Sequence, residues 1–180
     1  MIDFKEKVSE TLSLRTGAEV TIEWRINIKG VMTGWCRLRE AALILPAAEA
    51  VAGLEGRLSM ITAYLSDSAK QKGVREIAFH FDLDGTTLTL GIELPLEGAR
   101  IPSLTPLFRN ADWHEREFME LYDIQVIGHP APRRLFLDRS IDPAAFERLI
   151  PYSTFSNGAN SKALWEKVMA RSGNNRKELQ

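Results

Sequence analysis

The feature that most constrains the fold is a pair of alternating runs on either side of Asp84-Gly85, in the segment EIAFHFDLDGTTLTLGIEL. An Asp-Gly pair between alternating runs is typical of a two-residue β-hairpin turn. A turn here gathers the apolar side chains on one face, with Leu83 opposite Thr86, Phe81 opposite Leu88, Phe79 opposite Leu90 and Ile77 opposite Ile92. A shift of one residue would break this match, so the register is well specified. His80 falls on the polar face, where we expect a solvated or helix-facing residue rather than a ligand.

Two further segments favour strands. Residues 20–28, VTIEWRINI, alternate strictly, which predicts a half-buried strand with Trp24 on its dry face. Residues 57–65, RLSMITAYL, are rich in β-branched and aromatic residues. Between these segments, Gly34 indicates a turn or a bulge.

Helices are predicted at the N-terminus and in the middle of the first half. Asp3 and Glu6 have the spacing of a capping box, and Gly17 is suited to end the helix that starts there. The segment PAAEAVAGL predicts a short helix with Pro46 as its first residue and the following glycines as its end. Three prolines in residues 95–110 indicate loop or extended structure.

These elements predict an α+β fold, with a mixed or antiparallel sheet, helices packed on one face and an extended C-terminal segment. The length of 180 residues suits one domain with an appended tail. We place the α+β domain at residues 1–138 and a helical or extended tail at residues 139–180. Within the tail, SKALWEKVMA favours an amphipathic helix.

Composition excludes several classes of function. Lys and Arg total 23 against 24 Asp and Glu, and this balance argues against nucleic-acid binding by bulk electrostatics. The single cysteine, Cys36, can form neither an internal disulfide nor a thiolate cluster, so we expect no cofactor or redox centre on this chain. No run approaches the roughly 20 apolar residues of a membrane span, and the charged N-terminus is unlike a signal peptide. We therefore expect a cytoplasmic location, or one on the cytoplasmic face of a membrane complex.

The segment ADWHEREFMELYDIQVIGHPAPRRLFLD, residues 111–138, is dense in charges, aromatic rings and backbone-restricting residues. Its first half predicts a short helix, in which Asp112 and Glu115 have capping-box spacing. Arg116 and Glu120, four residues apart, favour a surface ion pair. Glu117 lies on the expected apolar stripe, where a carboxylate requires a cationic or hydrogen-bonding partner.

The second half of this segment offers such partners. Gly128 permits backbone conformations closed to other residues, and Pro130 and Pro132 restrict the chain around them. The GHPAP run is therefore expected to be a stiff turn that delivers Arg133 and Arg134 in a defined direction. We expect one of these arginines to pair with Glu117, so that Glu117→Ala would destabilise the chain or its docking by a few kcal/mol. Two solvated arginines are the alternative.

A metal site is a distant alternative. His114, Glu117 and His129 are metal-ligating residue types. Their spacing differs from the helical zinc motif, in which two histidines lie four residues apart with a glutamate between them.

Short runs within residues 102–138 carry a resemblance to a known family. They are Pro102-Ser103, the WHERE run from Trp113 to Glu117, the LYDI run from Leu121 to Ile124, Gly128-His129-Pro130, and Arg133-Arg134-Leu135. In order and spacing they resemble the signature of the thirty-kilodalton subunit family of respiratory complex I, the C subunits of the NADH–quinone oxidoreductases. Asp123 stands where the family usually has Gly, and Glu120 where it usually has Asp. Because Asp can adopt the left-handed conformation that Gly would supply, we expect the turn at Asp123 to be kept. The second family motif, R-K-D-[FY]-P-L, does not occur after Leu137, and in this the chain is most similar to the related subunit of membrane-bound, energy-converting nickel–iron hydrogenases.

The resemblance implies a non-catalytic accessory subunit that docks the large catalytic subunit beside the iron–sulfur small subunit, peripheral on the cytoplasmic face of a membrane. The residues it implies for docking are Trp113, Glu115, Arg116, Glu117, Tyr122, Gly128, His129, Pro130, Arg133 and Arg134. The alternative that it leaves open is the C subunit of an NADH–quinone oxidoreductase. An independent enzyme using a metal at His114, Glu117 and His129 is the more distant one.

Overall fold

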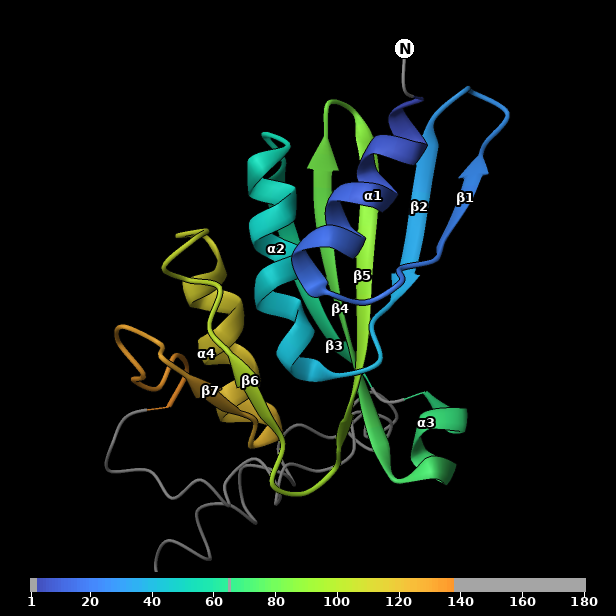
Figure 1. Cartoon of the computed structure of the whole chain (residues 1–180). Helices are drawn as coiled ribbons and strands as arrows, with labels where there is room; N and C mark the ends of the chain where they lie inside the picture. The colour runs from blue at the N-terminus through green and yellow to red at the C-terminus, as the bar shows by residue number, and fades with distance from the viewer. Residues whose placement is uncertain (1–2, 65, 138–180) are drawn as a thin grey trace, which may run out of the picture. The chain divides into compact units, whose positions relative to one another are not determined.

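The computed structural model describes residues 3–64 and 66–137. Twelve elements follow one another along the chain (Figure 1). They are α1 (Phe4–Thr16), β1 (Ile22–Ile26), β2 (Met32–Arg37), the 3-10 turn η1 (Ala41–Leu43), α2 (Ile44–Gly53), β3 (Arg57–Tyr64), α3 (Asp67–Lys72), β4 (Val74–Leu83), β5 (Thr86–Pro95), β6 (Arg100–Pro102), α4 (Ala111–Tyr122) and β7 (Gln125–Ile127). The helix predicted in SKALWEKVMA lies outside the described residues, and the domain boundary at 138/139 stays a prediction.

Five strands form one sheet in the order β1-β2-β5-β4-β3. Strands β2 and β5 run parallel and the other neighbours antiparallel, so the sheet is mixed. The β4–β5 hairpin has the expected register throughout, including Phe81 opposite Leu88 and Phe79 opposite Leu90. Asp84 and Gly85 both have positive φ, at 49° and 80°, which matches the twist of the two strands.

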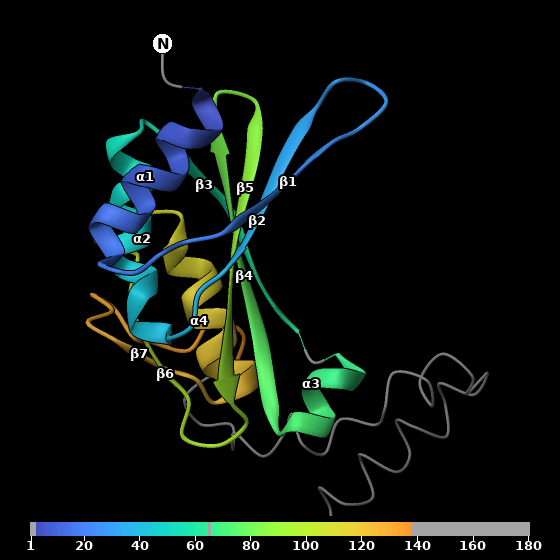
Figure 2. The same ribbon diagram turned by 45° about the vertical axis from the view of Figure 1, so that its right-hand side comes forward.

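The core lies between the sheet and the helices. Figure 2 shows α1, α2 and α4 on the same side of the sheet. The apolar side chains of β4 and β5 in this core are all buried: Ile77, Phe79, Phe81, Leu83, Leu88, Leu90, Ile92 and Leu94. The predicted α+β fold with a mixed sheet is confirmed, and α1, α2 and α4 pack on one face, whereas the short helix α3 lies off that side (Figure 2).

Gly34 belongs to neither a turn nor a bulge. It lies inside β2, opposite Trp24 of β1. A Cβ at Gly34 would lie 2.7 Å from the Trp24 ring, so glycine is needed there because the indole packs directly on the backbone. Helix α2 also departs from expectation: it starts at Ile44, so Pro46 is its third residue. Proline is tolerated there because the first N–H groups of a helix have no partner within it.

The buried face predicted for residues 20–28 covers only the first part of that segment. Trp24 packs edge-on against Phe4 of α1, with ring centroids 6.1 Å apart, but Ile26 and Ile28 are exposed. The strand itself ends at Ile26, and the following turn carries Ile28 away from the core. The prediction for this half of the segment was wrong because no helix extends over it.

Helix α1 begins after Asp3 and ends at Gly17, whose φ of 65° lies in the left-handed region, as expected. The Asp3 side chain makes no capping hydrogen bond. Past the main sheet, β6 and β7 pair in parallel. Because the pairing is parallel, the loop after β6 and the loop after β7 start at the same end of this strand pair.

Candidate functional site

Helix α4 buries two ionisable side chains in the protein interior. Glu115 is 1% exposed and Arg116 is 7% exposed. Charged groups are buried at a high cost unless they are paired or hydrogen-bonded. Their partners therefore define what this helix does.

Glu115 binds the turn that follows β6. Its carboxylate accepts hydrogen bonds from the Ser103 hydroxyl at 2.6 Å, the Thr105 hydroxyl at 2.7 Å and the Leu104 backbone N–H at 2.5 Å. The capping box predicted for Asp112 and Glu115 is thus absent. The helix begins after Asn110, and Glu115 uses its oxygens to hold a separate segment.

His129 lies on the other side of this carboxylate, and its side chain is fully buried. Its Nδ1 accepts a hydrogen bond from the Ala131 N–H at 3.0 Å, so the proton of a neutral ring is on Nε2. That Nε2 lies 3.4 Å from an Asp112 oxygen and 3.7 Å from a Glu115 oxygen, without hydrogen-bond geometry to either. The positive end of the imidazole N–H therefore faces two carboxylates.

Arg116 and Glu120, one helical turn apart, hold the backbone of the chain after β7. Arg116 donates from Nε to the carbonyl of Arg133 at 2.8 Å and from Nη2 to the carbonyl of Arg134 at 2.9 Å. Glu120 accepts from the N–H groups of Leu135, Phe136 and Leu137 at 2.7, 2.7 and 2.8 Å. We call this set of five hydrogen bonds the latch. Figure 1 shows the latched segment running beside α4.

The latch also determines the ionisation of Glu120. Partial burial raises the pKa of this carboxyl, but three backbone N–H donors and the charge of Arg134 outweigh it. The pKa of Glu120 therefore lies below its ordinary value. The surface ion pair predicted between Arg116 and Glu120 is absent, because both side chains turn to the latched backbone instead.

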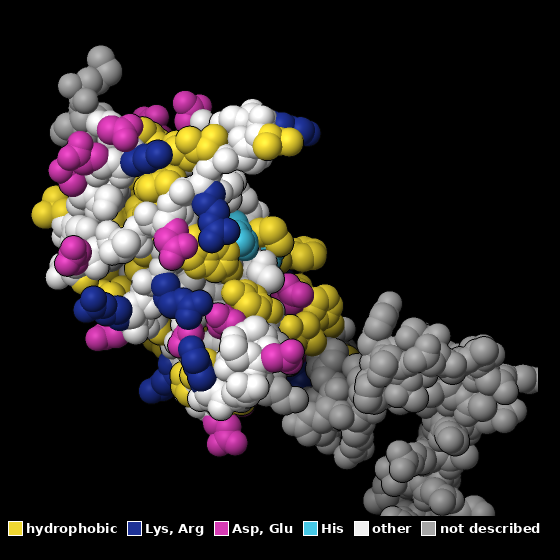
Figure 3. Space-filling model, turned by 90° about the vertical axis from the view of Figure 1, so that its right-hand side faces the viewer, with side chains coloured by type: hydrophobic (Ala, Val, Ile, Leu, Met, Phe, Trp, Pro, Cys, Tyr) yellow, Lys and Arg dark blue, Asp and Glu magenta, His cyan; other side chains and the backbone are white. Residues whose placement is uncertain are grey.

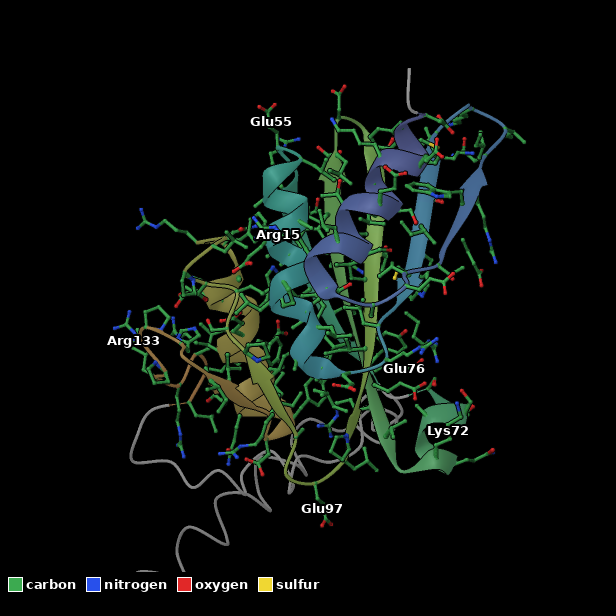
Figure 4. All side chains as sticks on the ribbon, viewed as in Figure 1. Arg15, Glu55, Lys72, Glu76, Glu97 and Arg133 are labelled. Carbon is green, nitrogen blue, oxygen red and sulfur yellow. The ribbon has the colours of Figure 1, made fainter. Side chains whose placement is uncertain are left out.

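Glu117 lies apart from the Glu115 cluster and from the latch. It faces β3 and lines a shallow pocket with His114, Phe118 and Tyr122. Among the ion pairs of the described residues there is none between Glu117 and Arg133, and Figure 4 shows Arg133 pointing outward from α4. The expected pairing therefore does not form with Arg133, and the carboxylate that α4 buries is a different one, Glu115, two positions earlier.

The remaining predicted site residues divide into exposed and structural ones. Trp113 is 67% exposed, and Pro130 is exposed as well. Gly128 has a φ of 81°, which requires glycine or a strained residue. Tyr122 binds Arg75, whose guanidinium lies 4.8 Å from the ring centroid and donates to the Tyr122 carbonyl.

The distant metal hypothesis does not fit this arrangement. His114 and Glu117 face β3, whereas His129 lies beside Asp112 and Glu115. Within residues 3–64 and 66–137, no three His, Cys, Asp or Glu side chains are grouped so as to hold a metal ion.

Sequence reasoning missed the roles of four residues around α4. Thr105 was given no role, and Ser103 was named only within the family resemblance. Asp112 and Glu120 were expected to form a helix cap and a surface ion pair, whereas Asp112 lies beside His129 and Glu120 binds backbone N–H groups. The turn at Asp123 was expected to survive the loss of glycine, and it does: Asp123 has φ 51° and ψ 39° and ends α4. In the part of the chain that the structure describes, no helix is long and apolar enough to cross a membrane.

Known sequences resemble the chain most strongly over short stretches. The J subunit of the NAD(P)H-quinone oxidoreductase of Synechococcus sp. is 57% identical over 37 residues, which is 21% of each chain. The C/D subunit of the NADH-quinone oxidoreductase of Gluconacetobacter diazotrophicus is 43% identical over 51 residues, 28% of this chain and 8% of that protein. The matched stretch thus spans about a fifth of the first relative and less of the second.

Solved structures share the fold. The trypsin-resistant fragment (1-134) of Nqo5 superposes with a TM-score of 0.53 and 23% identity, covering 69% of this chain and 98% of the fragment. A chain of the membrane-bound sulfane sulfur reductase, an archaeal respiratory membrane complex, has a TM-score of 0.56 and 12% identity, covering 89% and 95%.

The sequence model of one protein family matches residues 38–153, which is more than half of the chain and includes α4, β7 and the latch. That family is described as respiratory-chain NADH dehydrogenase, 30 Kd subunit. The chain therefore belongs to the thirty-kilodalton subunit family of the respiratory-chain NADH dehydrogenase.

Proposed function

We propose that this chain is a non-catalytic accessory subunit of a membrane-associated oxidoreductase, and that it docks the large catalytic subunit of an energy-converting nickel–iron hydrogenase-like complex. The observation that carries the proposal is how the family motif divides its residues. The buried ones, Glu115, Arg116 and His129, hold backbone and hydroxyl groups of this chain. The exposed ones, Trp113, Pro130 and Arg133, are left to meet a partner.

The segments that the buried cluster and the latch hold carry exposed apolar side chains. Leu107 donates its N–H to the carbonyl of Leu104, which itself is bound to Glu115. Ile127 accepts the N–H of Ser103, and the N–H of Phe136 binds Glu120. The side chains of Leu107, Ile127 and Phe136 are nevertheless exposed, as is Trp113. We call these four residues together with Arg133 the motif surface.

The motif surface has the composition of a protein interface. Aromatic residues and arginine are enriched at the centres of such interfaces, and large exposed apolar groups are costly without a partner. Fixing them by buried hydrogen bonds lowers the ordering cost on association. The surface thus suits docking to another protein better than chemistry of its own.

The proposed partners are the large catalytic subunit and the iron–sulfur small subunit of the parent complex. The chain would reach the cytoplasmic face of the membrane through that complex, and would bind neither nucleic acid nor a redox cofactor. Cys36 is consistent with this, because burial raises the pKa of its thiol to about 11 and disfavours the thiolate that metals bind.

A second candidate is the C subunit of an NADH–quinone oxidoreductase. The names of the matching relatives favour it. The absence of an R-K-D-[FY]-P-L run after Leu137 favours the hydrogenase branch instead.

The test is a mild-detergent purification of the tagged full chain from its host, with mass spectrometry of the co-purifying proteins. Capture of a large subunit bearing two separated Cys-x-x-Cys pairs supports the hydrogenase-like complex. A large subunit without those cysteines supports the NADH–quinone oxidoreductase. Recovery of neither contradicts the accessory role.

Two variants locate the docking site. Trp113→Ala and Arg133→Glu are expected to lower recovery of the large subunit at least tenfold, because both side chains are exposed on the motif surface. Leu14→Ala is the matched control, since Leu14 is an exposed apolar residue of α1, a helix that contributes no residue to the motif surface. Equal recovery with all three variants would remove the motif surface from the docking site.

A further inference from the structure

The two edges of the five-stranded sheet differ in how they are protected. At β3, the Asn110 side chain of the α4 N-cap donates to the Leu58 carbonyl at 2.7 Å, and the register shifts between Leu58 and Met60. Such irregularities and covers prevent further strands from pairing at an edge. At the opposite edge, β1 pairs with β2 in an unbroken register over all five residues. Figure 1 shows β1 as the outermost strand of the sheet.

Strand β1 is chemically self-complementary. Its sequence is IEWRI, with Trp24 at the centre. In an antiparallel pair of two such strands about Trp24, each Ile22 lies opposite Ile26 and each Glu23 lies opposite Arg25. Opposite charges and apolar or aromatic pairs directly across two strands are the favourable cross-strand combinations.

The charged side chains of β1 are available for this pairing. The side chains of Arg25 and Glu23 are 83% and 72% exposed, and their one ion pair, with each other, is loose at 3.8 Å. A strand edge protected by like charges repels a second copy. A Glu and an Arg placed symmetrically about the centre attract one instead, since a twofold axis brings each against its opposite.

Apolar surface continues beyond the strand. Ile26, Ile28 and Val31 are exposed around the β1–β2 turn. The turn is ordered, because the Asn27 side chain accepts the N–H groups of Lys29 and Val31. Figure 3 shows this hairpin projecting at the upper right, with hydrophobic side chains at its end. An ordered edge with exposed apolar groups is a ready template for another strand.

We propose that β1 pairs antiparallel with β1 of a second copy of this chain, about a twofold axis at Trp24, to form one continuous sheet. Each Glu23 then lies against the Arg25 of the other copy, and the half-buried Trp24 rings lie side by side. Five residues on each side make a small interface, so the dimer is weak and depends on concentration. The proposal concerns the chain by itself and does not depend on the docking function.

The experiment is sedimentation equilibrium of the full chain over a wide concentration range, for the wild type and for three charge variants. The single variants E23R and R25E place like charges opposite each other, and their dimer dissociation constants are expected to rise at least tenfold. The double variant E23R/R25E restores opposite charges and is expected to dimerise like the wild type.

A mixture of the two single variants provides the most specific test of the proposed pairing. An E23R chain and an R25E chain complement each other at both contacts, so their equimolar mixture is expected to form a heterodimer when neither forms a homodimer. Glu97→Arg is the matched control, because Glu97 is exposed and far from β1 (Figure 4). Circular dichroism spectra identical to the wild type establish that the variants are folded.

Three results would overturn the proposal. One is a wild-type chain that stays monomeric at the highest concentration, which would leave the β1 edge to another protein. Another is dimerisation of both single variants as tight as that of the wild type, which would place the contact elsewhere. The third is a mixture of monomeric single variants that fails to associate.

Discussion

The Nε of Arg116 donates to the backbone carbonyl of Arg133 at 2.8 Å, while the Arg133 side chain points outward. One arginine thus recognises the main chain of the other. The same guanidinium also binds the carbonyl of Arg134, so both carbonyls that trypsin would attack in this segment are engaged.

The latch is therefore expected to protect residues 133–137 from trypsin. Arg116→Ala removes both latch hydrogen bonds of a buried charged donor, each typically contributing about 1.5–3 kcal/mol, together with its 3.4 Å hydrogen bond to Asp112. We expect cleavage after Arg133 and Arg134 to accelerate at least tenfold, measured by mass spectrometry of timed digests. Arg109→Ala, at an exposed arginine just before α4, is the control. Equal cleavage rates in wild type and Arg116→Ala would show that the latch is not closed in solution.

Glu115, rather than Glu117, is expected to be the carboxylate on which stability depends. Glu115→Ala leaves three donors without their acceptor, and we expect a loss of about 3–5 kcal/mol in the free energy of unfolding. Glu117→Ala at the half-buried position is the comparison, with an expected loss below about 1 kcal/mol. Urea denaturation measures both. A larger loss for Glu117→Ala would contradict the buried cluster.

The lowered pKa of Glu120 predicts how the stability of the folded chain depends on pH. Its pKa in the folded chain lies below the ordinary value of 4.5. The stabilisation by its ionised form is therefore complete above pH 4.5 and is lost as pH falls through the lower folded-state pKa. The difference in unfolding free energy between the wild type and Glu120→Gln is expected to stay constant from about pH 7 to 5 and to shrink below that. A difference that is unchanged at low pH would exclude the latch as its source.

Gly34 tests the packing of Trp24. Gly34→Ala places a Cβ 2.7 Å from the indole, and we expect about 1–3 kcal/mol of destabilisation. Gly53→Ala is the matched control, because a Cβ there meets nothing within 4 Å. Thermal unfolding followed by Trp fluorescence reports on both. A Gly34→Ala variant as stable as the wild type would mean that Trp24 does not rest on β2.

The predictions that the structure confirms rest on residues that are close together in the sequence. Asp84-Gly85 and the alternation around it specify turn type and register together, because hairpin pairing joins residues close in sequence. Asp123 could be assigned a left-handed turn because its own side chain tolerates that conformation.

The predictions were wrong where contacts between segments that are distant in the sequence determine the structure. Gly34 was expected in a turn, and only the pairing of β1 with β2 shows that Trp24 needs its missing side chain. Residues 26–28 were expected to be half buried, but the helices stop short of them.

Sequence alone determined the family resemblance, the central hairpin and the segment in which the buried charges lie. Tertiary structure decided which charge is buried and what it binds. Helical periodicity allows either Glu115 or Glu117 to face inward, since only the position of the neighbouring loops distinguishes them. Ser103, Thr105 and His129 come from either side of α4 in the sequence, and in the folded chain, where β6 pairs with β7, they meet at Glu115. A carboxylate is stable in the interior only where such donors converge, and that convergence is a property of the folded chain.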